Sequence, residues 1–66
     1  MDFAERLKEL RTDSNLSQAA LAKAIGVSQK AIDYWEREIN EPKASYIIEL
    51  AKYFGVSCDY LLGQEK

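Results

Sequence analysis

Residues 18–35 read QAALAKAIGVSQKAIDYW, and this stretch decides the fold. Apolar residues recur at helical spacing up to Ile25, and Gly26 follows as a residue type that ends helices. Only Val27 then separates the glycine from Ser28, whose hydroxyl oxygen suits the N-cap of a new helix. A connection this short forces two helices to cross steeply. The stretch therefore predicts two helices joined by a tight turn.

The side chains of this stretch also indicate how the two helices pack. Ala22 lies on the inward face of the first helix, and its small side chain permits a close approach. Ile32 and Trp35 supply the inward face of the second helix. Two short helices at a steep angle form the helix-turn-helix motif, which we place at residues 17–37. An ordinary corner between two helices of a small bundle is the alternative.

Helical spacing continues through the rest of the chain. It predicts helices at about residues 2–11, 18–25, 28–37 and 44–54, with a fifth between Ser57 and Gly63. No stretch alternates with period two for long enough to form a strand. We therefore predict an all-α fold, a compact five-helix bundle in which residues 1–66 form a single domain.

Composition bounds the compartment and the partners. The net charge is −2 and the pI is about 5.0, a balance that disfavours non-specific binding to nucleic acid. No apolar run approaches the ~20 residues of a membrane span, and no secretory signal follows Met1. Cys58 is the only cysteine and has no internal disulfide partner, which suits a reducing compartment. We therefore expect a cytoplasmic protein that has no membrane partner.

The residue types exclude the common catalytic arrangements. Histidine is absent, and the solitary Cys58 has no base to activate it. The carboxylates alternate with lysine and arginine on exposed faces, and residues 26–30 lack the spacing of a phosphate-binding loop. The sequence shows no metal-ligand cluster. We predict that the chain is not an enzyme and that it binds no metal, cofactor or small molecule.

The outward face of the predicted third helix carries polar side chains that suit the edges of DNA bases. A glutamine amide pairs with adenine, lysine donates to guanine, tyrosine contacts a thymine methyl group, and aspartate accepts from cytosine. The residues that we expect to contact bases are Ser28, Gln29, Lys30, Asp33 and Tyr34. The same residues also fit a face that is only solvated, because helical periodicity locates faces and not partners.

A second set of residues suits the DNA backbone. Ser17 and Gln18 begin the second helix, where free N–H groups and the positive end of the helix dipole favour a phosphate oxygen. Arg37 and Lys43 add two cations, and we expect all four residues to contact phosphates. For Ser17, ordinary capping of the helix is the alternative, and both roles are compatible.

The sequence resembles the phage Cro and repressor family of the XRE type from Phe3 to Gly63. The matching features are LSQAALAKAIGVSQKAI, the tryptophan–glutamate pair at residues 35–36, the loop proline Pro42 and the closing LAKYFGVSCDYLLG. The resemblance implies a lambda-repressor-like DNA-binding domain whose third helix enters the major groove. It assigns Gln18 to phosphate, and it implies an ion pair between Arg11 and Glu36, the residues at the matching positions.

These observations predict sequence-specific binding of double-stranded DNA by a bacterial or phage-encoded transcriptional regulator that acts as a repressor. We expect a homodimer, at least on DNA, that reads a pseudo-palindromic operator. The apolar and aromatic content of Tyr60, Leu61 and Leu62 exceeds what a short terminal helix needs for its own core, so we place the dimer contact there. Tyr53 is a further candidate for this surface.

The loop after the third helix departs from the family pattern. Glu38 and Glu41 place negative charge where phosphates are expected nearby, and Lys43 stands where a serine cap is common. With the acidic pI, this favours an alternative function: a protein–protein interaction module of the same fold, or an antitoxin-type component, with weak or no DNA binding.

Overall fold

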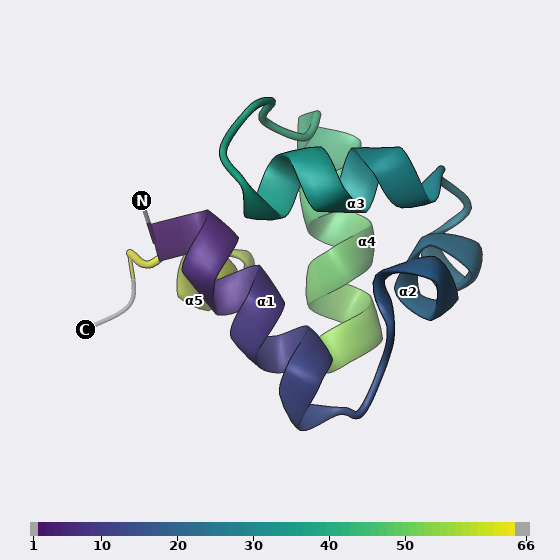
Figure 1. Cartoon of the computed structure of the whole chain (residues 1–66). Helices are drawn as coiled ribbons and strands as arrows, with labels where there is room; N and C mark the ends of the chain where they lie inside the picture. The colour runs from purple at the N-terminus through teal and green to yellow at the C-terminus, as the bar shows by residue number, and fades with distance from the viewer. Residues whose placement is uncertain (1, 65–66) are drawn as a thin grey trace.

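The computed structural model describes residues 2–64 of the chain (Figure 1). These residues contain five α-helices and no strand. The helices are α1 (Asp2–Asp13), α2 (Gln18–Ile25), α3 (Gln29–Glu36), α4 (Ala44–Phe54) and α5 (Cys58–Leu61). α2 packs against α3, α1 packs against α3 and α5, and α4 packs against α2 and α5. This arrangement confirms the predicted all-α five-helix fold.

Three serines start three of the helices in the same way. The hydroxyl oxygen of each accepts a hydrogen bond of 2.9–3.1 Å from the backbone N–H three residues later. These N-caps are Ser17 for α2, Ser28 for α3 and Ser57 for α5. Because each cap satisfies a backbone donor that the helix itself leaves free, the sequence starts these helices at defined positions.

The tight turn between α2 and α3 depends on Gly26. This residue has a φ of +87°, in the left-handed region, and its N–H donates to the carbonyl oxygen of Ala22 over 2.8 Å. A residue with a Cβ atom is strained in that conformation. The glycine therefore ends α2 and lets the chain reverse within two residues, before the N-cap of α3 at Ser28.

The first helix is longer than the sequence predicts. We placed its end near Arg11, but α1 continues to Asp13. The hydroxyl group of Thr12 donates to the carbonyl oxygens of Lys8 and Glu9, over 2.9 and 3.2 Å, so this residue fits inside the helix. The turn between α1 and α2 therefore begins only after Asp13.

One apolar core joins all five helices. Leu7, Leu21, Ile32, Leu50 and Leu61 are completely buried, one from each helix. Trp35 joins them with 6% of its surface exposed, and its ring lies 5.6 Å from that of Tyr46 between centroids. No buried residue of the described chain is polar or charged. The crossing of α2 and α3 therefore rests on apolar packing, which gives the outer side of α3 a rigid base.

The structure removes the reason for which we placed the dimer contact at residues 60–62. Leu61 is fully buried in the core of its own chain. The Tyr60 ring is also engaged within the chain, because the guanidinium of Arg6 lies 4.0 Å from its centroid and donates to the Tyr60 carbonyl oxygen over 3.0 Å. Residues 60–62 are therefore not in excess of what the monomer needs. Of the residues that we named, Tyr53 keeps a largely exposed side chain, at 47%.

Candidate nucleic-acid interface

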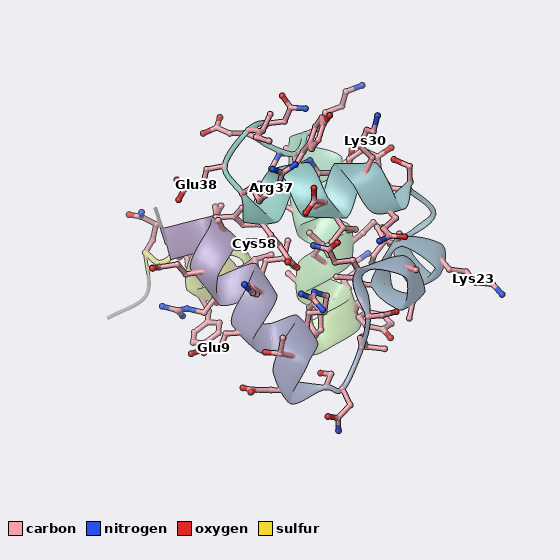
Figure 2. The ribbon with its side chains drawn as sticks, viewed as in Figure 1. Glu9, Lys23, Lys30, Arg37, Glu38 and Cys58 are labelled. Atoms are coloured by element: carbon pink, nitrogen blue, oxygen red, sulfur yellow. The ribbon has the colours of Figure 1, made fainter. Side chains whose placement is uncertain are left out.

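Six polar side chains gather in an open hollow between the start of α2 and the outer side of α3. We call this hollow the α2–α3 face; its residues are Gln18, Gln29, Lys30, Asp33, Tyr34 and Arg37. Figure 2 shows Lys30 and Arg37 near opposite ends of α3. The structure thus brings four predicted base-contacting residues together with two predicted phosphate-contacting residues.

The other three predicted site residues lie at helix starts outside this hollow. The hydroxyl groups of Ser17 and Ser28 accept the capping hydrogen bonds of α2 and α3. Lys43 is the N-cap residue of α4, where its side chain makes no capping hydrogen bond. Its side chain is exposed.

Arg11 and Glu36 form a nearly buried ion pair behind the α2–α3 face. The Nε and Nη2 atoms of Arg11 donate to the two carboxylate oxygens of Glu36 over 2.6 and 3.0 Å. The side chains are only 11% and 3% exposed. Arg11 also donates through Nη1 to the carbonyl oxygen of Leu16, over 2.8 Å. The hydrogen bond that Arg11 donates to Glu36 raises the pKa of the arginine, so the guanidinium keeps its charge, and the pair ties α1 to α3.

Gln18 extends this pair toward the surface. Its Nε2 atom donates to Glu36 Oε1 over 3.2 Å and to Asp33 Oδ1 over 3.3 Å. One amide at the start of α2 therefore bridges two carboxylates of α3. Reasoning from the sequence missed this bridge, although Asp33 and Glu36, three residues apart on a helix, are expected to share a face.

Asp33 accepts a second partner on its other oxygen. Arg37 donates to Asp33 Oδ2 from Nε over 3.0 Å, and the Nη2 atom lies 2.8 Å from the same oxygen. The hydrogen bonds from Gln18 and from Arg37, in that order of size, lower the pKa of the Asp33 carboxyl group. The two side chains are 33% and 59% exposed for Asp33 and Arg37. Both oxygens of this carboxylate are thus engaged within the protein.

Tyr34 lies between two cations on the same face. The Nζ atom of Lys30 is 5.9 Å from the centre of the Tyr34 ring, and the Cζ atom of Arg37 is 5.8 Å from it. Cations at this range are attracted to the ring face. The Tyr34 ring is therefore within reach of both positive charges of this face.

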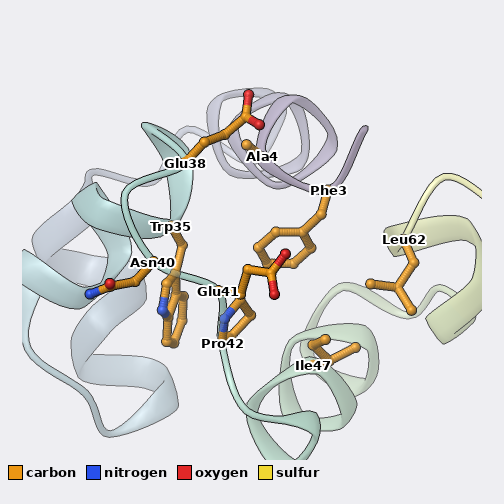
Figure 3. A pocket seen from close by; sticks show the side chains of 9 residues that line it. All are labelled: Phe3, Ala4, Trp35, Glu38, Asn40, Glu41, Pro42, Ile47 and Leu62. Carbon is orange, nitrogen blue, oxygen red and sulfur yellow. The ribbon is translucent and has the colours of Figure 1, made fainter. Parts of the chain in front are cut away.

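The acidic loop residues belong to a different surface. Glu38 and Glu41 line a pocket of about 220 Å³ whose apolar lining includes Phe3, Trp35 and Leu62. Figure 3 shows the two glutamates around these apolar side chains. Glu38 and Glu41 are not among the residues of the α2–α3 face. Glu38 and Glu41 thus line a different pocket from the cations Lys30 and Arg37, although Glu38 directly follows Arg37 in the chain.

None of the five helices is long and apolar enough to cross a membrane, as far as residues 2–64 are concerned. Among the same residues, no group of three or more histidine, cysteine, aspartate or glutamate side chains is placed to hold a metal ion.

Known proteins are similar to this chain in sequence and in fold. The chain is 39% identical over 66 residues to the HTH-type transcriptional activator BcrR of Enterococcus faecalis. It is 43% identical over 60 residues to repressor protein C2 of Salmonella phage P22. These matches cover 100% and 91% of this chain but only 32% and 28% of the relatives, so the chain spans about a third of their length.

Solved structures agree with the sequence matches. The crystal structure of the P22 c2 repressor protein in complex with a synthetic operator superposes on this chain with a TM-score of 0.90. The identity is 38%, and the match covers 98% of both chains. A model of the helix-turn-helix family matches residues 7–61, which include α2, α3 and the turn between them. Its helices α2 and α3 are joined by the tight turn at Gly26 and share a polar face. This chain belongs to the helix-turn-helix family.

Proposed function

We propose that this chain binds double-stranded DNA sequence-specifically as part of a transcriptional regulator, with α3 in the major groove. One observation carries the proposal: the six side chains of the α2–α3 face lie together on a rigid base. The likeness to a repressor structure that was solved with operator DNA supports it, since that chain is matched over 98% of its length. A helix of this kind presents its outer side chains to base edges.

The proposed base contacts come from the exposed part of the α2–α3 face. Gln29 and Lys30 stand in the first turn of α3, and both are exposed. Tyr34 lies one turn further along and is partly buried, so its ring has a defined position. Ser28 completes the proposed set, although its hydroxyl group already caps α3. Asp33, which the sequence also assigns to base contact, has both carboxylate oxygens engaged by Gln18 and Arg37.

The proposed phosphate contacts surround this set. The first N–H groups of α2 have no acceptor within the helix, and they lie beside Ser17 and Gln18. Arg37 and Lys43 supply exposed cations at the end of α3 and the start of α4. A contact from each of these elements to the DNA backbone would hold α3 in the groove.

We further propose that the regulator is a repressor, works as a homodimer on a pseudo-palindromic operator and has no catalytic role. A single module of this size makes few contacts, and a two-fold pair doubles them and sets the spacing of the half-sites. Such a protein acts in the compartment that holds the DNA, which in a bacterium is the cytoplasm.

The test is a salt titration of binding to random duplex DNA. Each phosphate neutralised by a cation contributes about 0.9 to the slope of log affinity against log salt, so Arg37 and Lys43 together predict ~2 units. Arg37→Gln should reduce the slope. Lys23→Gln is the matched control, because Figure 2 shows Lys23 pointing away from α3. Binding that is absent, or that does not depend on salt, would contradict the proposal.

A second candidate function is a protein-interaction module. The net charge of −2 and the pocket lined by Glu38, Glu41 and apolar side chains favour it. The two functions differ in which surface matters. Substitutions on the α2–α3 face should abolish the activity of a DNA-binding protein, whereas a protein-interaction module should tolerate them.

A further inference from the structure

We propose that Asp33 is a positioning residue, which holds Arg37 in the free protein and releases it to a DNA phosphate when duplex is bound. This inference rests on the proposed DNA-binding function. It differs from the base-reading role that the sequence suggests for Asp33, because both carboxylate oxygens already have partners: Gln18 on Oδ1 and Arg37 on Oδ2.

In the free protein, the carboxylate of Asp33 binds the Arg37 guanidinium in the way that we propose for a DNA phosphate. The Nε and Nη2 atoms of the guanidinium both lie within 3.0 Å of Oδ2. A guanidinium offers the same fork of donors to a carboxylate and to a phosphate, so either anion satisfies it. The free protein therefore keeps the cation oriented on the surface that would meet DNA.

The ion pair is placed so that it can exchange its anion. The Arg37 side chain is 59% exposed, and the pair connects residues four apart on the outer side of the helix. Exposed pairs of this kind are weak, because water screens them. An incoming phosphate therefore competes with Asp33 on nearly equal terms.

Gln18 keeps its position when Arg37 leaves. Its amide also donates to Glu36 Oε1 over 3.2 Å, and Glu36 is held in turn by the nearly buried Arg11. The side chain at the start of α2 thus has an anchor that does not depend on Arg37. The exchange would move one cation and leave the rest of the α2–α3 face in place.

The exchange carries a cost that every duplex meets. When Arg37 moves to a phosphate, the charge of Asp33 loses its closest cation and faces an anionic duplex. Because the same exchange occurs on random DNA and on an operator, its cost cancels in their relative affinity. Asp33 should therefore weaken binding to random DNA and to the operator alike.

The experiment is a double-mutant cycle on random duplex DNA at fixed salt. Asp33→Asn keeps the size of the side chain and removes its charge. We expect it to raise the affinity for random DNA by roughly two- to fivefold, the range for one exposed charge pair. In an Arg37→Gln background the same substitution should give a clearly smaller gain, because only the repulsion between the Asp33 charge and the duplex then remains. Glu9→Gln is the control for net charge, because Glu9 is an exposed residue of α1 that Figure 2 shows away from α3.

Three results would overturn the inference. An equal gain from Asp33→Asn with and without Arg37 would mean that the carboxylate acts as a general negative charge. A changed base preference in binding-site selection with Asp33→Asn would make Asp33 a base-reading residue. Equal gains from Asp33→Asn and Glu9→Gln would show that position does not matter.

A measurement on the free protein separates this inference from the proposed function. An NMR titration of the Asp33 carboxyl group should give a pKa below its ordinary value, and the pKa should rise in the Arg37→Gln variant. An unchanged pKa would overturn the role of Asp33 while leaving DNA binding intact. A wild-type protein that binds no duplex would overturn the proposed function, and the release step with it, whatever the titration shows.

Discussion

Arg11 and Glu36 meet through two hydrogen bonds of 2.6 and 3.0 Å, although they are 25 residues apart in the chain. The pair joins α1 to α3 at a point where both side chains are almost excluded from water. A second ion pair lies nearby on the surface, where Asp33 and Arg37 are four residues apart in the chain and remain solvated. The two ion pairs therefore have different consequences for stability.

Removal of Arg11 should destabilise the domain strongly. Arg11→Ala leaves the Glu36 charge buried without its partner, which should lower the free energy of unfolding by about 3 kcal/mol. Arg37→Ala, at the solvated pair, should cost less than about 1 kcal/mol and serves as the control. Urea unfolding followed by circular dichroism measures both. Similar losses for the two variants would show that burial does not distinguish the pairs.

Loss of Trp35 should unfold the domain. The side chain is 6% exposed and packs against Tyr46, so Trp35→Ala should cost ~3–5 kcal/mol through lost burial and the cavity left behind. A chain of 66 residues buries a modest core and has little stability to spare. Tyr53→Ala removes an aromatic side chain that is 47% exposed and should change the melting temperature little. A folded Trp35→Ala protein would mean that the core repacks.

The two glutamines of the α2–α3 face should differ in what they recognise. Gln29 is exposed in the first turn of α3, so Gln29→Ala should cost ~1–3 kcal/mol on the best operator and relax the preference at one position of each half-site. Gln18→Ala should weaken binding to every sequence and leave the preference intact. Binding-site selection with both variants measures this.

Two results would contradict these roles of the glutamines. Gln64→Ala, at an exposed residue near the end of the described chain, is the control for the effect of a glutamine-to-alanine change on folding. If a folded Gln29→Ala protein selected the same sites as the wild type, the base-reading surface would lie elsewhere. If Gln18→Ala changed the preferred base, its hydrogen bonds to Asp33 and Glu36 would be positioning α3 itself.

Stability should depend on pH through Asp33. Hydrogen bonds from Gln18 and Arg37 lower its pKa in the folded protein, so the charged form is favoured there. The resulting contribution is fully present above the unfolded pKa of ~3.9 and is lost as the pH falls through the lower folded value. Unfolding measured across this acidic range should therefore show the gap between wild type and Asp33→Asn closing. A gap that stays constant would argue against the shift.

The sequence predicted the helix-turn-helix more accurately than the outer parts of the fold. α2 has the predicted bounds because the capping serine Ser17 and the helix-ending Gly26 are local signals. α4 ends as predicted at Gly55, although its N-cap residue, Lys43, makes no side-chain capping bond. The end of α1 was missed because Thr12 is a common turn residue, and only its hydrogen bonds to the preceding turn place it in the helix. The role of Leu61 was missed because a helix of four residues is too short to show which face is buried.

The candidate site was predictable in outline only. Helical periodicity placed Lys30, Asp33 and Tyr34 on the outer side of α3, and the structure gathers them in one hollow. The bridge from Gln18 to Asp33 could not be predicted, because it depends on the angle at which α2 crosses α3. That angle is set by apolar packing around Leu21, which no spacing rule describes.

The stacking of Arg6 on Tyr60 makes the first and last helices unfold as one unit. α5 has four residues and cannot persist without tertiary contacts. Arg6 fastens it to α1 by a ring contact and by a hydrogen bond to the Tyr60 carbonyl oxygen, while Leu61 fills the core beneath. Any fluctuation that lifts α5 also uncovers the apolar side of α1. Backbone amides of these two helices should thus exchange with solvent in a common opening event, although two thirds of the chain lies between them in sequence.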